Sequence, residues 1–116
     1  MQEAFIHLPV ADNDGKDLGP HMDHVLGLIL DAFGGYTVVD AQGAWKDPKT
    51  GKVYREPVKR VAVAANWDAY GVRAVLHDIA VKACRYMRQE CIYLALPDGV
   101  EFVGPEVSTG ANIAAE

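Results

Sequence analysis

Serine and cysteine are scarce in this chain. Ser108 is the single serine, and it lies in no Gly-x-Ser-x-Gly motif, which excludes the nucleophile elbow of the serine hydrolases. The two cysteines, Cys84 and Cys91, lack the Cys-x-x-Cys spacing and have no histidine pair near them. A disulfide scaffold and a structural zinc site are therefore excluded. We expect two reduced thiols that are at least partly buried.

Long apolar runs and a basic excess are also missing. No apolar stretch approaches the roughly 20 residues that span a bilayer, and residues 1–4 carry an acid where a secretory signal carries bases. We therefore expect a cytoplasmic protein with no membrane partner. The net charge of −5 has the wrong sign for binding a phosphate backbone, so no nucleic-acid partner is expected either.

The charge that is present is divided unevenly along the chain. Residues 1–50 hold eight acids and three bases, whereas residues 51–100 hold five acids and eight bases. In other respects the composition is that of an ordinary globular domain, with 116 residues, 50% of them hydrophobic and 23% charged. We expect one α+β domain over residues 1–103, followed by a small, polar and frayed C-terminal tail over residues 104–116.

Apolar residues at helical spacing predict two helices. The first covers residues 19–33, because Pro20 suits a first helical turn and Gly34 suits the end of a helix. The second covers residues 68–88, with Asp68 as its N-cap. Three cations fall in its last turns, where they complement the helix dipole: Lys82, Arg85 and Arg88.

Runs of β-branched and aromatic residues predict the strands, which cover residues 4–10, 36–45, 53–65, 91–96 and 100–103. Together with the helices they give the ferredoxin-like β-α-β-β-α-β arrangement, followed by a short extra strand. This is an α+β fold in which two helices cover one face of an antiparallel sheet. Right-handed crossovers would place the fourth strand beside the first, then the third and then the second. The two helices would run antiparallel to each other.

One stretch of the chain carries a recognisable pattern. Residues 33–45 contain an aromatic residue, a Gly-x-Thr-Val strand and a Gly-x-Trp, and Gly51, Glu56 and Gln89-Glu90 follow downstream. Over residues 31–102 this pattern resembles a family of small bacterial proteins known only as a domain of unknown function. The resemblance implies a shared fold and no particular reaction, because the family itself has no assigned activity.

The expected topology brings several functional residue types to one end of the sheet. We take that end as the candidate binding site, formed by Asp14, Asp17, His21, His24, Trp45, Arg85, Arg88 and Glu90. It should also hold ion pairs between Asp17 or Asp23 on one side and Arg85 or Arg88 on the other.

Two sets of residues at this end have metal-ligand chemistry. His21 and His24 share one face of the helix, and with Asp14 or Asp17 they have the chemistry to ligate a divalent metal. Two solvated histidines are the favoured interpretation, because metal ligands usually need closed first and second shells. The Asp12-x-Asp14 pair fails the register of a calcium loop. We therefore expect no metal and no cofactor.

The strands are apolar on both alternations, although helices would cover only one face of the sheet. Residues 4–10 and 91–96 contain no charged residue, and residues 36–45 contain only Asp40. A bare face this apolar is typical of an interface, and two-fold pairing is the commonest closed assembly. We predict a homodimer that buries these residues of the sheet face: Phe5 or Ile6, Trp45 and Tyr93.

Three classes of function stay open. No catalytic set is recognisable, so we assign no catalytic residue and favour a non-catalytic binding or assembly protein over an enzyme. The first alternative is a dimeric ferredoxin-like protein or enzyme that binds a small molecule between its sheet and a partner. The second is a small acidic inhibitor or adaptor, encoded by a mobile element or phage, that docks on a host protein through the acidic loop and the first helix.

Overall fold

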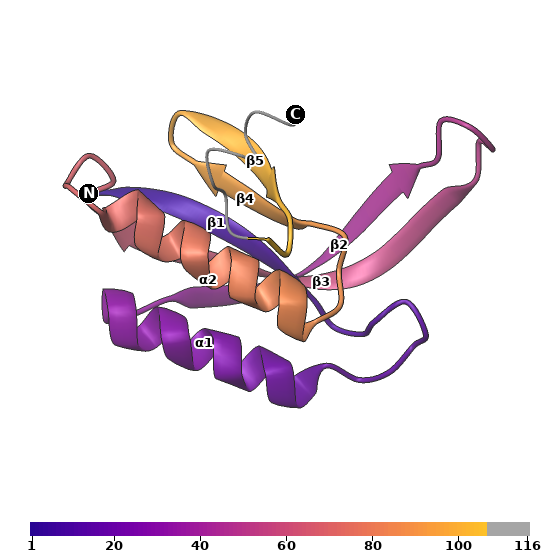
Figure 1. Cartoon of the computed structure of the whole chain (residues 1–116), viewed down its shortest axis with the longest axis horizontal. Helices are drawn as coiled ribbons and strands as arrows, with labels where there is room; N and C mark the ends of the chain where they lie inside the picture. Colours follow the sequence, from indigo (N-terminus) through magenta and orange to yellow (C-terminus); the bar gives the residue numbers. More distant parts are fainter. Residues whose placement is uncertain (107–116) are drawn as a thin grey trace.

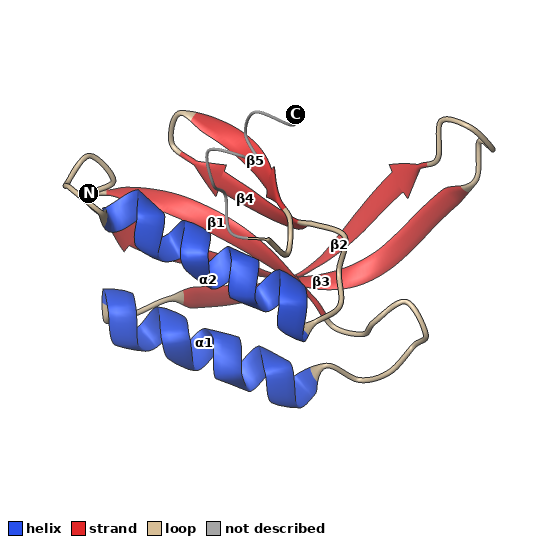
Figure 2. Cartoon of the chain, viewed as in Figure 1, coloured by secondary structure: helices blue, strands red, loops and turns tan. Residues whose placement is uncertain are grey.

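Turn-forming residues divide the chain into two helices and five strands (Figures 1 and 2). The computed structural model describes residues 1–106, so most of the predicted tail, residues 104–116, lies outside the described residues. In chain order the elements are β1 (Gln2–Pro9), α1 (Gly19–Phe33), β2 (Thr37–Lys46), β3 (Val53–Ala65), α2 (Val72–Tyr86), β4 (Ile92–Leu96) and β5 (Gly99–Val103).

Helix α1 has the predicted bounds. Pro20 lies in its first turn, and Met22, Val25 and Ile29 form the buried stripe that faces the sheet. Gly34 ends the helix in the left-handed conformation, with φ of 80°, and its N–H donates to the carbonyl of Leu30 at 2.8 Å. A side chain at this position would be strained, which explains why glycine stands there.

Helix α2 is shorter than predicted at both ends. Asp68 is not its N-cap: the helix begins at Val72 after Gly71, which has a φ of 81°. The intervening turn is held by Trp67, which is buried and whose indole N–H donates to the carbonyl of Gln2 at 2.7 Å. At the other end Arg88 adopts a φ of 54°, which stops the helix before the predicted last residue.

All five strands are antiparallel and lie in the order β2-β3-β1-β4-β5. The first four strands therefore have the predicted order, and β5 adds a further edge. Helices α1 and α2 lie side by side on one face and run in opposite directions (Figure 1). Neither helix of residues 1–106 is long and apolar enough to cross a membrane.

The core lies between the helices and the sheet. Alternate residues of β1, namely Ala4, Ile6 and Leu8, point into it and have 0% exposure. Ile6 therefore belongs to the core, and the part of the interface prediction that named it is wrong. Phe5, the other residue of that prediction, lies on the opposite face of the same strand.

Strands β2 and β3 continue beyond the rest of the sheet as a two-stranded ribbon (Figure 1). Strand β1 pairs only with residues 58–65 of β3, whereas β2 continues to pair with residues 53–57. We call residues 42–57 the hairpin arm. Pro57 is tolerated inside a strand because β1 does not reach it and needs no N–H from it.

Candidate functional site

Among residues 1–106 both helices lie on one face of the sheet and no element covers the opposite face, which we call the open face. Strand alternation turns the neighbours of the core residues onto it. The register aligns one residue from each strand in a row across the whole sheet, and we call this the open-face row: Val39, Arg60, His7, Tyr93 and Phe102.

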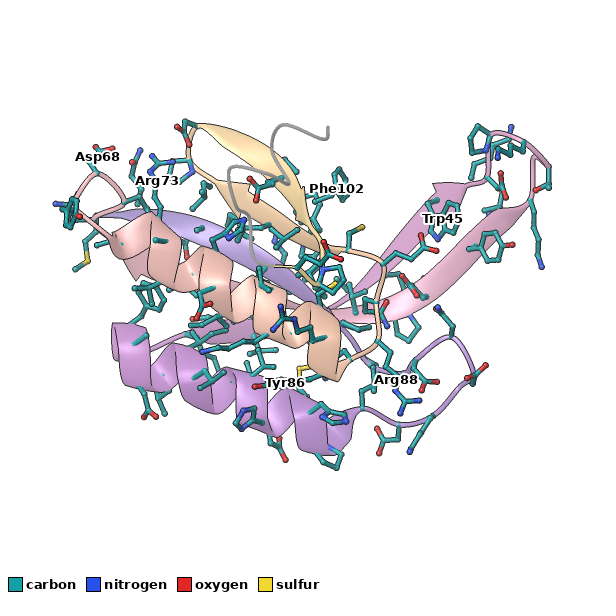
Figure 3. All side chains as sticks on the ribbon, viewed as in Figure 1. Trp45, Asp68, Arg73, Tyr86, Arg88 and Phe102 are labelled. Atoms are coloured by element: carbon teal, nitrogen blue, oxygen red, sulfur yellow. The ribbon has the colours of Figure 1, made fainter. Side chains whose placement is uncertain are left out.

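The rings of this row contact one another. His7 stacks on Tyr93, with 4.3 Å between ring centroids, and Phe102 meets Tyr93 edge-on at 5.8 Å. Both edges of the row are exposed, with 51% exposure at Val39 and 67% at Phe102 (Figure 3). The open face therefore carries a row of mainly apolar and aromatic side chains, exposed at its two edges within the described part of the chain.

Arg60 is the only cation of the row, and an aromatic ring partly masks its charge. Its guanidinium carbon lies 4.0 Å from the centroid of the Phe5 ring. This cation–π geometry keeps the arginine flat against the sheet. The guanidinium group therefore lies along the sheet, and it interrupts the apolar side chains of the open face only over a small area.

His7 occupies the middle of the open face. Burial lowers the pKa of this imidazole from its usual 6.5, and the charge of Arg60 lowers the pKa further. The ring is therefore neutral at pH 7. Its Nε2 is buried and has no hydrogen-bond partner among residues 1–106. An unpaired buried nitrogen of this kind is uncommon.

A second aromatic group lies on the hairpin arm. Trp45 and Tyr54 are cross-strand partners whose rings stack with 4.6 Å between centroids. Their exposure is 53% and 37%, and the ammonium group of Lys52 lies 4.8 Å from the Tyr54 centroid. Trp45 has the same alternation as Val39, so this pair lies along the arm on the continuation of the open face, beyond Gly43 and Glu56.

The end of the sheet named from the sequence assembles only in part. His21 and His24 flank Tyr86 of α2, with ring centroids 6.5 and 5.2 Å apart, so the start of α1 does meet the end of α2. Trp45 lies on the arm, away from Tyr86 and Arg88 (Figure 3). Strand alternation and turn signals did not reveal how far β2 and β3 extend beyond β1, which is why Trp45 was grouped with the helix ends.

The acids of this end shape the loop before α1. Asp17 accepts the N–H of Gly19 at 3.0 Å, and Asp12 accepts the N–H of Asp14 at 2.9 Å. Asp14, Asp17 and Glu90 are exposed. Within residues 1–106 no three of the histidines, cysteines and acids are grouped to hold a metal ion.

The predicted ion pairs at this end are absent. Within the described part of the chain, neither Asp17 nor Asp23 lies within salt-bridge distance of Arg85 or Arg88. Arg85 instead donates from Nε to the carbonyl of Pro105. The carboxylate of Asp17 is already engaged by its own loop, so the two charged groups have different partners.

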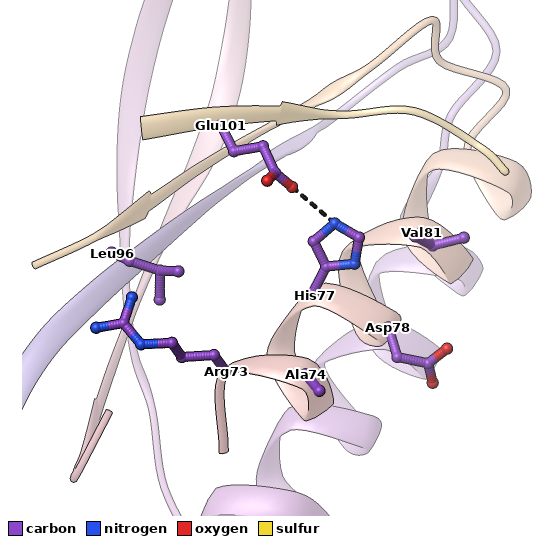
Figure 4. A pocket seen from close by; sticks show the side chains of 7 residues that line it. All are labelled: Arg73, Ala74, His77, Asp78, Val81, Leu96 and Glu101. Carbon is purple, nitrogen blue, oxygen red and sulfur yellow. Dashed lines mark ion pairs between the residues drawn. The ribbon is translucent and has the colours of Figure 1, made fainter. Parts of the chain in front are cut away.

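A polar cluster that no sequence pattern indicates lies between α2 and the β4–β5 hairpin (Figure 4). His77 Nε2 lies 2.6 Å from the Glu101 carboxylate, and Arg73 lies 2.7 Å from Asp98. The hydrogen bond from Arg73 lowers the pKa of Asp98. Arg73, His77 and Glu101 border a hollow of about 430 Å³ with Leu96 among its apolar walls. The two residues of each pair are far apart in the chain. They meet because the β4–β5 hairpin lies beside α2.

This cluster is a clasp between two layers. The Arg73 Nε donates to the Trp67 carbonyl at 2.9 Å, while its Nη atoms face Asp98 and Asp68. The donors of Arg73 are thus engaged within the chain. We therefore assign the cluster a structural role and take the open face as the candidate functional site.

Comparisons with known proteins give the fold. No family model and no curated protein matches the chain. A phage SAM lyase in complex with S-methyl-5'-thioadenosine is similar, with 13% identity, 92% of each chain covered and a TM-score of 0.66. A phage SAM lyase in its apo state shares 10% identity over 92% of this chain and 91% of that one, with a TM-score of 0.61.

A third similar structure is a variant of CutA1 from Pyrococcus horikoshii OT3. It shares 7% identity, covers 98% of this chain and 92% of its own, and has a TM-score of 0.50. At such identities the likeness establishes the α+β fold alone. The resemblance to the bacterial family of unknown function stays a prediction.

Proposed function

We propose that the chain is a ferredoxin-like assembly protein whose copies associate through the open face as a homodimer. The observation that supports this most is the open-face row, which crosses all five strands and contains one charged residue, Arg60. An antiparallel sheet tolerates an uncovered face when that face is polar. Here the uncovered face is aromatic, and a second copy is the partner that is always available.

The apolar side chains provide enough free energy for such an interface. Burying one aromatic or large aliphatic side chain contributes about 1.5–3 kcal/mol, and association costs about 4–15 kcal/mol in lost freedom. Phe102, Val100 and Val39 are all more than half exposed in one copy, and an isologous interface buries each of them twice. A neutral His7 adds no charge to be desolvated.

Light scattering coupled to gel filtration, at protein concentrations from about 1 to 100 µM, tests the assembly. The wild type is expected to elute as a dimer and Phe102→Glu as a monomer. Leu30→Glu is the matched control, because Leu30 is an exposed apolar residue on α1, away from the open face. A wild type that stays monomeric throughout this range contradicts the proposal.

A second candidate function is binding of an adenosyl sulfonium or of its thioether product on the same face. The specific observation in its favour is the fold likeness over 92% of the chain to a SAM lyase that holds S-methyl-5'-thioadenosine. Aromatic side chains stack on a nucleobase, with about 1–3 kcal/mol per base, and ring faces attract cations. Phe102 is 67% exposed and offers its ring for such contacts, and Tyr93 lies beside it.

The bond that such an activity breaks follows from the two compounds. S-methyl-5'-thioadenosine is S-adenosylmethionine without the amino-acid chain on sulfur, so the bond from sulfur to that chain breaks and sulfur keeps the electron pair. A lyase adds no water, so the carbon released from sulfur must form its new bond within the amino-acid fragment itself.

Calorimetric titration with S-methyl-5'-thioadenosine tests binding, and mass spectrometry of S-adenosylmethionine incubated with the protein tests turnover. Binding that is lost in Tyr93→Ala supports a ligand site on the open face. Formation of the thioether supports an enzyme. If neither compound binds, the second candidate is wrong and the assembly proposal stands unchanged.

A further inference from the structure

The hairpin arm carries a concentration of positive charge in an acidic chain. Four cations, Lys46, Lys49, Lys52 and Arg55, are exposed on it. Of the two acids on the arm, Asp47 accepts the N–H of Lys49 at 2.8 Å and Glu56 is half-buried. The arm is thus basic near its tip, and the stacked rings of Trp45 and Tyr54 lie next to that tip.

The loop before α1 has the opposite charge. The acidic surface, which we define as Asp12, Asp14, Asp17 and Asp23, contains one nearby cation, Lys16. Hydrogen bonds hold this loop in shape: the N–H of Leu18 donates to the Val10 carbonyl at 3.0 Å, and the N–H of Lys16 donates to the Asp12 carboxylate at 2.9 Å. Asp12, Asp14 and Asp17 are therefore presented on an ordered loop, and Asp23 lies beside them in α1.

Neither surface is neutralised within one copy. Among residues 1–106, no salt bridge involves the four arm cations or the four acids of the acidic surface. Both surfaces project from the same end of the molecule, and the arm extends away from the loop (Figure 1). A basic arm and an acidic loop on every copy are complementary between copies.

We propose that the hairpin arm of one copy docks on the acidic surface of a second copy. This inference rests on the proposed self-association and states where the arm goes. A two-fold axis makes the contact twice, arm to loop and loop to arm, so the charges of both copies are compensated. The rings of Trp45 and Tyr54 then lose solvent contact beside the ion pairs, as aromatic residues do at the centre of interfaces.

A single-stranded nucleic acid is the competing occupant of a basic arm that carries aromatic rings. The net charge of −5 and the acidic surface at the same end disfavour it, because both repel a phosphate backbone. The second copy is favoured because it supplies the complementary charge on the same polypeptide.

Charge-swap variants measured by analytical ultracentrifugation test the docking. The arm variant is Lys49→Glu with Lys52→Glu, and the loop variant is Asp14→Lys with Asp23→Lys. Each is expected to weaken dimerisation about tenfold or more at low salt, which is about 1.4 kcal/mol for each factor of ten. An equimolar mixture of the two is expected to associate more tightly than either alone, because the reversed arm then meets a reversed loop.

The control for the arm variant is Lys82→Glu with Arg85→Glu on α2, which changes the net charge by the same amount and sign and lies off the arm. It is expected to leave the dissociation constant within about threefold of the wild type. The wild-type affinity should also fall as salt rises, because the screening length shortens from about 10 Å at 0.1 M to about 3 Å at 1 M.

Three outcomes overturn the inference, and they are distinguishable. If the arm variant dimerises like the wild type while Phe102→Glu is monomeric, the docking of the arm is wrong and the open-face interface is right. If the wild type never dimerises, both proposals are wrong. If the arm variant loses binding to a labelled single-stranded oligonucleotide but keeps its dimer affinity, the arm serves nucleic acid and not a second copy.

Discussion

The helix-covered face and the open face of the sheet are made by alternate residues of the same strands, yet a single copy buries only one of them. On β1, Ile6 has 0% exposure beneath the helices, while its neighbours Phe5 and His7 are half-buried on the other side. Both faces are apolar. The difference teaches that the core is built on one face alone, and the other face is the one through which we propose that copies associate.

The two faces also treat their polar atoms differently. The helix-covered face buries apolar residues, and no polar or charged residue among residues 1–106 is fully buried. The open face holds His7 with an unpaired Nε2 and Arg60 against a ring. Such features are uncommon in a packed protein core. They agree with our proposal that this face forms an interface.

The largest expected effect separates the faces by adjacent residues of one strand. Ile6→Ala should lower the free energy of unfolding by about 2–5 kcal/mol, because it opens a cavity in a packed core. Phe5→Ala should cost less than half as much in the monomer, because Phe5 is only half-buried and lies on the open face. Urea unfolding of both variants, at a concentration where the chain is monomeric, measures the difference. Equal costs would mean that the open face is part of the folding core.

A pH titration sharpens the contrast at His7. Its pKa is lowered in the folded state, so the unfolded chain binds the proton more readily and stability rises with pH. The contribution is fully present above the unfolded value of about 6.5 and is lost as pH falls through the lowered folded value. The groups that face this ring are Arg60 from β3 and Tyr93 from β4.

The free energy of unfolding of the wild type, measured between pH 7.5 and 5, should therefore decline more steeply than that of His7→Phe. His21→Phe is the control, because His21 is exposed on α1. If His7→Phe shows the same pH dependence as the wild type, the imidazole is not held neutral on the open face.

Much of the fold was predictable, because local patterns fix it. The stripe of Met22, Val25 and Ile29 and the glycine at 34 predicted α1 with the correct bounds. The start of α2 was not predictable from Asp68, since a buried Trp67 extends the turn to Gly71. Capping preferences describe the isolated helix, and here tertiary packing of the preceding turn prevailed.

The candidate site was harder to predict, and the reason is register. Because β1 is apolar on both alternations, the sequence does not say whether Phe5 or Ile6 points at the helices. Tyr93 was identified correctly as an open-face residue, but Phe102 was missed because β5 was treated as a short extension. The length of the hairpin arm depends on where β1 stops pairing, which no local signal reports.

The smallest expected effect concerns the clasp that joins α2 to the edge of the sheet. His77 and Glu101 are 31% and 55% exposed, so their ion pair resembles surface pairs that contribute about 0.2–1 kcal/mol. Glu101→Gln should cost no more than this, and under conditions where the imidazole is protonated the loss should shrink at high salt because screening weakens the charged pair. Glu90→Gln is the control, as an exposed acid with no ion pair among residues 1–106. Thermal unfolding at low and high salt measures both variants. A loss of several kcal/mol in Glu101→Gln would mean that the β4–β5 hairpin depends on this contact. Packing against α2, and not strand pairing alone, would then hold this edge of the sheet in place.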